Sequence, residues 1–333
     1  MKVAVYGAGA VGSVMGGLLA RGGTDVTLIG RGAHFDAMAA GGVTVKSGKD
    51  DPFTVRPRCV ADPAAAGVQD FVLMTVKAHS VPDAAARIAP MLGPDTAVVA
   101  AQNGIPWWYF HRAGGRFDGR RLKTVDPDGR CWDLIGPART IGAVISASCD
   151  VEAPGRVHNF GNRSLTLGEP DGGVSARCTR LAAALTAAGI EAPVLPNIRD
   201  AVWSKLWGNI SFSQIAVLTG STLGPLVADP VLQDFGRRIM AETQAVGEAA
   251  GARFLGTIDS RIEMTARVGA HKTSILVDLE RGRRLEIDAQ VGAVIEIARL
   301  AGVATPTIDL LYALVRHRAV NSGCYPADAP LPG

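Results

Sequence analysis

Short apolar runs alternate with amphipathic stretches along the first 195 residues of the chain. A short apolar run is typical of a buried strand, and apolar positions three or four apart are typical of a helix. Their alternation predicts an α/β fold with a doubly wound parallel sheet, in which later strands can be antiparallel. The predicted strands are 3–6, 26–29, 71–76, 96–101, 141–148, 156–160 and 164–168, and predicted helices include 82–91 and 174–188.

The alternation ends near Asn197, and long helical patterns follow to about Val320. We therefore predict two domains, an α/β domain of residues 1–196 and an all-helical domain of residues 197–333. The segment 110–138 is rich in Gly, Pro and Arg, which favours an insertion or long loop, and a lid is one interpretation. The predicted C-terminal helices are 199–218, 230–250, 285–301 and a last one that opens at Thr305-Pro306.

A glycine-rich turn follows the first predicted strand, with the spacing G-x-G-x-x-G. In a Rossmann-type domain the first glycine permits a tight turn, the second lets the backbone approach a pyrophosphate, and the third lets the helix pack closely. A purely structural turn and a signal peptide are the alternatives, but a second strand follows, and residues 7–17 contain five glycines. The predicted dinucleotide-binding residues here are Gly7, Ala8, Gly9, Ala10, Val11 and Gly12.

The second predicted strand ends at Gly30-Arg31, where an NAD site would carry an acidic residue for the adenosine ribose. Without that carboxylate nothing repels a 2′-phosphate, and the guanidinium of Arg31 can bind one with two hydrogen bonds. The sequence therefore favours NADP(H) as cofactor. The alternative is that Arg31 is a solvated surface residue.

Composition narrows the class of protein. The 333 residues are 47% hydrophobic and 20% charged, with a net charge of +3, which is too small to indicate nucleic-acid binding. No apolar run approaches the length of a membrane span. Five cysteines without a C-x-x-C pair and six scattered histidines favour reduced thiols, no metal site and a cytoplasmic location.

The segment 203–209 carries the candidate chemistry of the second domain. Lys205, Asn209 and Ser213 lie at positions i, i+4 and i+8 of an otherwise apolar pattern, so a continuous helix would place them on one face. Buried polar groups need partners, which a ligand-lined cleft would provide. The alternative is a solvated face from which Lys205 reaches outward.

Together these segments resemble the ketopantoate reductase (2-dehydropantoate 2-reductase) family over nearly the whole chain. Each motif alone is weak, but the order and spacing of the set match. The matching segments are Gly7-x-Gly9-x-x-Gly12, Arg31, Val76-Lys77-Ala78, Gln102-Asn103-Gly104, Lys205-x-x-x-Asn209, the run from Thr273 to Asp278, and Glu286-Ile287-Asp288.

The resemblance implies an NADPH-dependent reductase of a small 2-keto acid, bound in a cleft between a Rossmann domain and a helical domain. Lys205 would be the general acid, Asn103 would position Lys205 or the nicotinamide, and Glu286 would bond the substrate hydroxyl or a water. The implied catalytic residues are thus Lys205, Glu286 and Asn103; the substrate-binding residues are Asn209, Ser213 and Ser274; and Lys77, Asn103 and Glu286 would lie near the cofactor.

Three positions depart from the family pattern and leave the substrate open. The family usually has Asn where this chain has Ser213, Gln where it has Val277, and Asn where it has Ile308. The expected activity is reduction of ketopantoate to pantoate, and a reductase of another 2-keto acid is an alternative. A non-catalytic NADP(H)-binding sensor is a further alternative, and a homodimer is compatible with the sequence.

Overall fold

The chain forms two compact units in the computed structural model, which describes residues 1–48 and 50–333. The first unit contains residues 1–102, 110–112 and 129–198. The second contains residues 103–109, 113–128 and 199–333. Two excursions, 103–109 and 113–128, thus pack with the C-terminal helices although they are surrounded in sequence by residues of the first unit.

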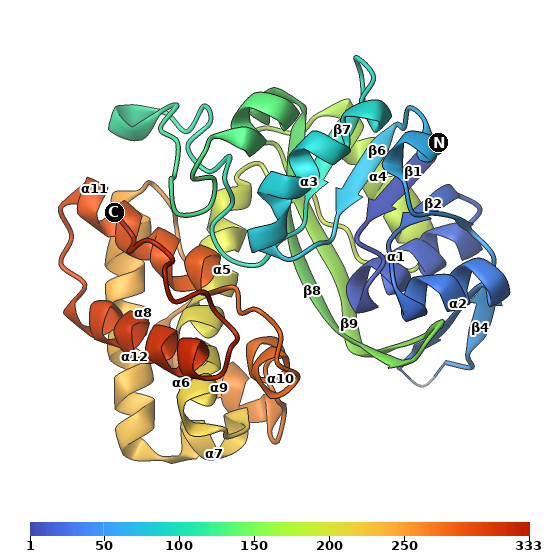
Figure 1. Ribbon diagram of the computed structural model, residues 1–333. Coiled ribbons are helices and arrows are strands. Elements are labelled where there is room, and N and C mark those ends of the chain that lie inside the picture. Colours follow the sequence, from blue (N-terminus) through green and yellow to red (C-terminus); the bar gives the residue numbers. More distant parts are fainter. Residues whose placement is uncertain (49) are drawn as a thin grey trace. The chain divides into compact units, whose positions relative to one another are not determined.

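The described strands form one nine-stranded sheet in the first unit, in the order β4-β3-β9-β8-β7-β6-β1-β2-β5 (Figure 1). Most neighbours are parallel, while β3–β4 and β8–β9 are antiparallel. The strands are β1 (Lys2–Tyr6), β2 (Asp25–Ile29), β3 (Val43–Ser47), β4 (Phe53–Val55), β5 (Arg58–Val60), β6 (Phe71–Met74), β7 (Ala97–Ala100), β8 (Thr140–Ala153) and β9 (Arg156–Gly168).

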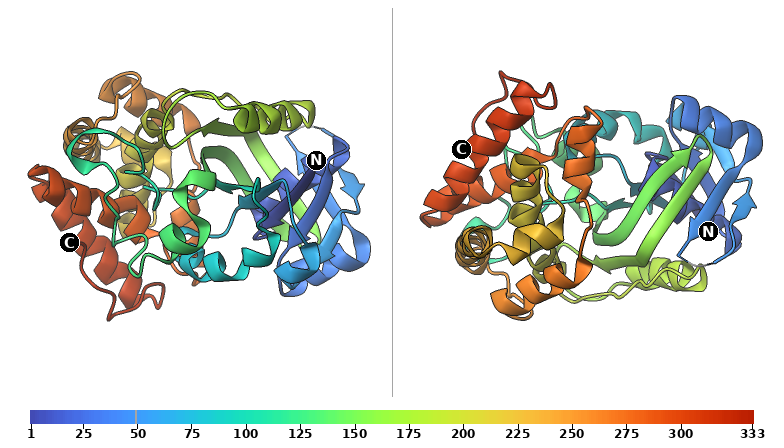
Figure 2. Two further views of the ribbon diagram at one scale, coloured as in Figure 1. Left: turned by 90° about the horizontal axis from the view of Figure 1, so that it is seen from above. Right: turned by 90° about the horizontal axis from the view of Figure 1, so that it is seen from below.

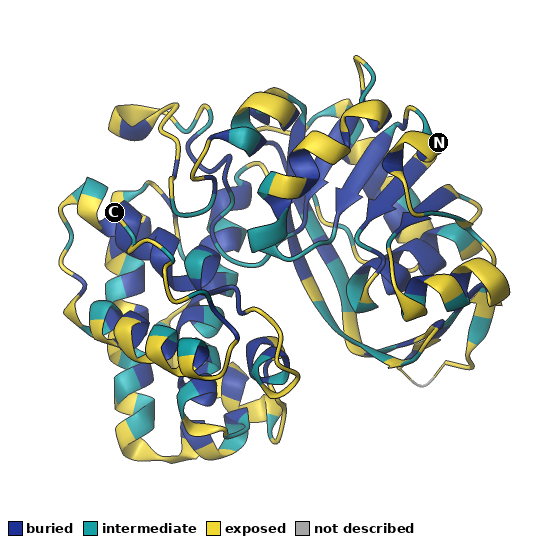
Figure 3. Cartoon of the chain, in the orientation of Figure 1, coloured by how far each residue is buried: buried dark blue, intermediate teal, exposed yellow. Residues whose placement is uncertain are grey.

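Helices cover both faces of the sheet, which explains why its central strands are apolar on both sides. All residues of β6 and β7 are buried, as Figure 3 shows in dark blue. The views of Figure 2 place α3 and α4 on opposite sides of the sheet. The helices of this unit are α1 (Ala10–Arg21), α2 (Ala33–Gly41), α3 (Val81–Arg87) and α4 (Ala176–Ala187). The predicted doubly wound Rossmann-type domain is confirmed.

Two predicted strands, 156–160 and 164–168, are one continuous strand, β9. The turn residues between them are accommodated by an irregularity in the β8–β9 ladder, where Ala147 pairs with Arg163 but Cys149 pairs with Asn159. The Asn159 side chain accepts a hydrogen bond from the Gly161 amide at 2.9 Å and donates one to the Asn162 carbonyl at 3.2 Å. A bulge therefore forms here in place of the expected break.

Other differences lie at the ends of elements. The predicted helix 82–91 ends at Arg87, because Pro90 cannot donate the hydrogen bond that would continue it. Helix α2 and strands β3 to β5 lie in residues 33–60, for which the sequence had suggested no element.

The second unit is built from helices, as predicted. Its helices are α5 (Ile198–Ile210), α6 (Phe212–Thr219), α7 (Leu223–Ala228), α8 (Pro230–Ala249), α9 (Ile258–Val268), α10 (Ser274–Glu280), α11 (Ala293–Ala301) and α12 (Pro306–Asn321). Helix α12 begins at Pro306, as the Thr305-Pro306 pair predicted. The carboxylate of Glu242 caps it, accepting hydrogen bonds from the Thr307 and Ile308 amides, both at 2.9 Å.

One predicted helix, 199–218, is wrong as a single element, because the chain breaks at Ser211 into α5 and α6. Ser211 has φ −97° and ψ −98°, outside the helical region. Its hydroxyl donates to the carbonyl of Trp207, four residues earlier, an arrangement that bends helices. Lys205 and Asn209 therefore lie on α5, whereas Ser213 lies on α6.

The predicted helix 285–301 is also shorter and irregular at its start. It opens with a π-helical turn, Asp288–Gly292, and continues as α11 to Gly302, whose φ of +71° ends the helix. Glu286 therefore stands just before the helix and is buried there.

The segment 110–138 is mostly irregular, as expected, but its residues 113–128 pack within the helical unit. The buried carboxylate of Glu296 accepts hydrogen bonds from the amides of Lys123 and Thr124, both at 2.8 Å. Leu122 beside them is fully buried. These contacts hold 113–128 as a packed part of the helical unit, and they do not favour the lid interpretation. In residues 1–48 and 50–333 no helix has the length and apolar character needed to cross a membrane.

Candidate active site

The glycine loop after β1 shows why each glycine is needed. A Cβ on Gly7, which has φ +107°, would lie 2.7 Å from Val76 Cγ1, and one on Gly12 would lie 2.3 Å from the Gly7 carbonyl oxygen. Packing alone therefore requires glycine at both positions. Gly9 differs, since a Cβ there would meet no described atom within 4 Å. Because Gly9 has no side chain, a ligand can approach the backbone closely at this position, as the pyrophosphate of a dinucleotide would need to do.

Hydrogen bonds from neighbouring strands fix this loop in place. The amides of Gly7 and Ala8 donate to the Ile29 carbonyl at 3.0 and 2.9 Å, and Thr75 Oγ1 donates to the Gly7 carbonyl at 2.9 Å. Helix α1 then starts at Ala10, where the first backbone amides have no acceptor within the helix and the helix dipole is positive. These residues fit a bound dinucleotide, with its pyrophosphate at the start of α1.

Arg31 and Lys77 follow the carboxyl ends of β2 and β6, at the same edge of the sheet as the loop. Gly30 packs on the loop, because a Cβ there would lie 3.3 Å from that of Ala8 and 3.1 Å from the Phe35 ring. Arg31 is exposed and Lys77 is half-buried. Their placement suits contacts to a cofactor at the carboxyl ends of the strands.

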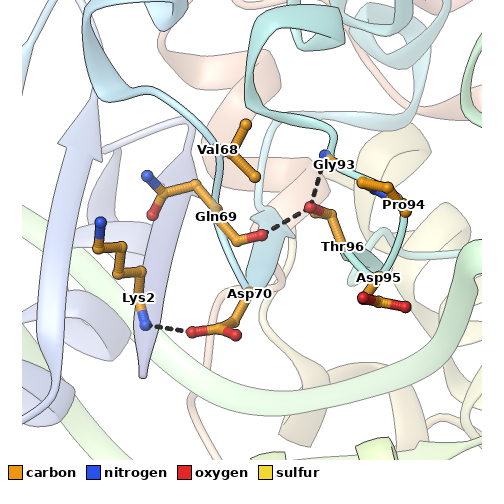
Figure 4. A pocket seen from close by; sticks show the side chains of 8 residues that line it. All are labelled: Lys2, Val68, Gln69, Asp70, Gly93, Pro94, Asp95 and Thr96. Atoms are coloured by element: carbon orange, nitrogen blue, oxygen red, sulfur yellow. Dashed lines mark hydrogen bonds between the residues drawn. The ribbon is translucent and has the colours of Figure 1, made fainter.

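A hollow of about 240 Å³ lies at the opposite, amino-terminal edge of the strands (Figure 4). Polar groups that line it form hydrogen bonds between the residues at which neighbouring strands begin. The Lys2 amide donates to Asp70 Oδ2 at 2.7 Å, and Thr96 Oγ1 donates to the Gln69 carbonyl at 2.6 Å. We therefore assign this hollow a structural role and place no cofactor there.

In the helical unit, Lys205 and Asn103 come together. Lys205 Nζ donates a hydrogen bond to Asn103 Oδ1 at 2.6 Å. An ammonium has no lone pair, so the amide must present its oxygen to Lys205 and direct its NH₂ elsewhere. Asn103 thereby orients the lysine, and its remaining donors are directed away from the ammonium.

Asn103 is held by the next residue, Gly104. Gly104 has φ +89°, and a Cβ there would lie 2.2 Å from the carbonyl oxygen of Ala289. The Ile105 amide donates to that same carbonyl at 2.8 Å. The 103–109 excursion is thus fixed to the π-helical turn that follows Glu286, and only glycine allows so close an approach.

The surroundings of Lys205 change its acidity. The residue is half-buried, but its ammonium is enclosed, and this burial lowers the lysine pKa to about 8. The Glu286 carboxylate acts in the opposite direction and raises the pKa, while the Arg261 guanidinium lowers it further. Lys205 is therefore mostly protonated at neutral pH, yet it is a stronger acid than a solvated lysine. Such a group can donate a proton to a developing alkoxide.

The predicted substrate-binding residues lie on three different helices. Asn209 is four residues after Lys205 on α5, Ser213 is on α6, and Ser274 is the first residue of α10. Asn209 and Ser213 are half-buried, and Ser274 is exposed. Helix α10 packs against α6, which brings the elements that carry the two serines together. The expected single stripe on one helix is wrong, because Ser213 lies on α6 and not on the helix of Lys205 and Asn209.

Comparison with known proteins identifies the family. Residues 3–172 match the family described as "Ketopantoate reductase PanE/ApbA", and residues 197–319 match "Ketopantoate reductase PanE/ApbA C terminal". The chain belongs to the ketopantoate reductase family. A curated 2-dehydropantoate 2-reductase from Mesorhizobium japonicum is 47% identical over 327 residues, covering 98% of this chain and 100% of that protein. The expectation of an oxidoreductase is thereby confirmed.

Solved structures agree with this membership. A candidate ketopantoate reductase from Ralstonia solanacearum MolK2 is 39% identical, with a TM-score of 0.92, over 97% of this chain and 99% of that one. D-mandelate dehydrogenase in complex with NADH and anilino(oxo)acetate has a TM-score of 0.83 over 97% of this chain and 99% of its own. At 22% identity, that second likeness shows the fold alone.

Some polar residues near the family motifs were not found from the sequence. Gln214 Nε2 donates to the Asn209 carbonyl and to Gln290 Oε1, both at 2.9 Å, and so connects α5, α6 and the π-helical turn. Arg261 lies on α9 beside Gly208. Neither residue had a local pattern that singled it out. The glycine inside the apolar segment 203–209 was the one available signal, since such a glycine often marks a close approach by another group.

We predict that Gly104→Ala is strongly destabilising. The left-handed conformation alone costs a non-glycine residue about 1–2 kcal/mol, and the clash with Ala289 adds about 1–3 kcal/mol. Gly119→Ala is the matched control, because Gly119 has φ +72° but no described atom within 4 Å of a Cβ. Chemical denaturation should show a clearly larger loss for Gly104→Ala. Equal losses at the two positions would contradict the close approach to Ala289.

Proposed function

We propose that the protein reduces ketopantoate to pantoate with NADPH, and that Lys205 is the general acid. The observation that carries this proposal is the Lys205–Asn103 hydrogen bond, at a site where burial lowers the lysine pKa to about 8. Membership of the ketopantoate reductase family supports the choice of substrate and a nicotinamide cofactor.

When bound, NADPH supplies a hydride to the ketone carbon, so negative charge develops on the ketone oxygen. The Lys205 ammonium stabilises that charge and gives its proton to the oxygen, which completes the alcohol. Asn103 keeps the ammonium in position, and Glu286 favours its protonated form. In this proposal the substrate is held by Asn209, Ser213 and Ser274, with its ketone oxygen at Lys205.

The cofactor would be held by the glycine loop, from Gly7 to Gly12, together with Arg31 and Lys77. Arg31 would contact the 2′-phosphate, since Gly30 offers no carboxylate to repel it. A reductase of a different 2-keto acid is the second candidate, because Ser213 is half-buried and accessible at a position where the family usually has asparagine. A homodimer stays a prediction, which light scattering on the purified protein would test.

Arg31→Ala should weaken NADPH binding much more than NADH binding. A hydrogen-bonded contact to a charged group contributes about 1.5–3 kcal/mol, which corresponds to about 10- to 150-fold in Kd. Titration of both cofactors by fluorescence or calorimetry measures this, with Arg87→Ala on α3 as an exposed-arginine control. Similar affinities of the unmodified protein for NADH and NADPH would argue against the proposed 2′-phosphate site.

Lys205→Ala should lower kcat by about 100-fold or more, as expected when a preorganised donor at a developing oxyanion is removed. Because a pKa of about 8 makes deprotonated lysine dominant above that pH, kcat/KM of the unmodified enzyme should fall as pH rises through about 8. The Ala variant should lack this decline and keep its NADPH affinity. Lys123→Ala changes an exposed lysine of the same unit and serves as the control; near-native turnover of Lys205→Ala would exclude the acid role.

Substrate choice is tested by pairing ketopantoate with 3,3-dimethyl-2-oxobutanoate, which lacks only the hydroxyl. Glu286 can accept a hydrogen bond from that hydroxyl, and a site built for such a bond disfavours an analogue without it. The kcat/KM ratio of the two substrates should favour ketopantoate, and Glu286→Ala should remove most of the preference. The ratio cancels any effect of Glu286 on Lys205. No preference in the unmodified enzyme would shift the assignment to another 2-keto acid.

A further inference from the structure

Arg261 on α9 has an unusual position within the helical unit. A Cβ on Gly208 would lie 2.6 Å from Arg261 Nη2 and 3.4 Å from its Cζ and Nε. The guanidinium therefore rests against the backbone of α5, in space that any other residue at 208 would occupy. Gly208 is three residues after Lys205 and immediately before Asn209, so the guanidinium lies on the part of α5 that carries the candidate catalytic residues.

The charge of Arg261 is not balanced by a neighbouring acid. Within residues 1–48 and 50–333 it forms no ion pair, and its buried Nε has no hydrogen-bond partner. Its Nη1 faces the Met264 sulfur at 3.7 Å, and a thioether is a weak acceptor. Burial lowers the arginine pKa, but a guanidinium stays charged at any physiological pH. Arg261 is half-buried, and a cation in that position with an unpartnered buried donor is stabilised when an anion binds to it.

Charge also connects Arg261 with Lys205 and Glu286. The guanidinium affects the Lys205 ammonium electrostatically, as Glu286 does with opposite sign. These three side chains carry two positive charges and one negative charge. A monoanionic ligand would neutralise the set, and a 2-keto acid is a monoanion whose carboxylate is bonded directly to the carbon that must be reduced.

We propose that Arg261 binds the carboxylate of the substrate, and that Gly208 is required because it gives the guanidinium access to this position. The proposal rests on the proposed function and adds a specificity residue to it. Arginine suits the task because its planar group can hold both carboxylate oxygens at once. A carboxylate held there, one helical turn from Lys205, would direct the adjacent ketone oxygen toward the ammonium.

The experiment compares a 2-keto acid with its methyl ester, which keeps the ketone and loses the charge. Arg261→Met should raise KM for the acid by about 10- to 150-fold, the effect of a lost charged hydrogen bond. KM for the ester and the Kd of NADPH should stay within about twofold, because neither involves the carboxylate contact. Arg267→Met, an exposed arginine on the same helix, is the control.

Two further variants guard against a simple loss of folding. Arg261→Lys keeps the charge but not the two-point contact, so it should lose part of the preference for the acid. Gly208→Ala leaves Arg261 in place but displaces its guanidinium, so it should shift the acid-to-ester ratio in the same direction as Arg261→Met. An unchanged ratio in these variants would overturn the proposal and leave Arg261 a packing residue.

Binding of oxamate, which resembles a 2-keto acid but has no reducible ketone, separates this proposal from the proposed function. Calorimetry should detect oxamate on the unmodified protein in the presence of NADPH and lose it with Arg261→Met. If the unmodified protein reduces ketopantoate but Arg261→Met binds oxamate as well as the unmodified protein does, the arginine site is wrong and the proposed function stands. If the unmodified protein reduces no 2-keto acid but its oxamate binding is lost in Arg261→Met, the proposed function is wrong and the arginine site stands.

Discussion

The hydrogen bond between Lys205 and Asn103 is the interaction on which the candidate chemistry depends. The two residues are 102 positions apart, and they meet because the chain leaves the sheet after β7 and packs briefly with the helices. Gly104 makes this excursion feasible, since any side chain there would meet the Ala289 carbonyl. Burial of the ammonium and its orientation by an amide thus follow from one close backbone approach.

Tyr109, five residues after Gly104, also attaches the 103–109 segment to the helical unit. Tyr109 is fully buried, its hydroxyl accepts a hydrogen bond from Trp203 Nε1 at 2.6 Å, and its carbonyl accepts one from Arg199 Nε at 2.7 Å. Trp203 and Arg199 belong to α5, the helix of Lys205. The 103–109 excursion is therefore anchored at both ends, to the π-helical turn by Gly104 and to α5 by Tyr109. These contacts explain how Asn103, which precedes the C-terminal helices by about 95 residues, is held against Lys205 on α5.

Local patterns predicted the parts of the fold whose causes are local. The strand before Gly7, the glycine spacing and the start of α12 all depend on residues adjacent in sequence, and all were predicted correctly. The break at Ser211 was missed because apolar residues continue through it and a single serine hydroxyl decides the bend. The cap of α12 was missed for the opposite reason, since Glu242 comes from α8. Motifs singled out Lys205, Asn103 and Glu286 as candidates, whereas Arg261 belongs to no motif and is noticed only through its contact with Gly208.

Ser213, Val277 and Ile308 depart from the family pattern, and their burial decides which of them could contact a substrate. Ile308 is fully buried in the helical core, so this change concerns packing. Val277 is half-buried on α10, and Ser213 is half-buried on α6, near the elements that carry Asn209 and Ser274. Serine is shorter than asparagine and offers one hydroxyl in place of an amide, so a substrate site that included Ser213, as we propose, would reach less far at this position. An arginine against Gly208 adds positive charge and several donors on the same part of α5. In the binding mode that we propose, this guanidinium would hold the carboxylate of the substrate, a group that every 2-keto acid carries, and the residues around Ser213 would contact the part of the substrate that differs from one 2-keto acid to another.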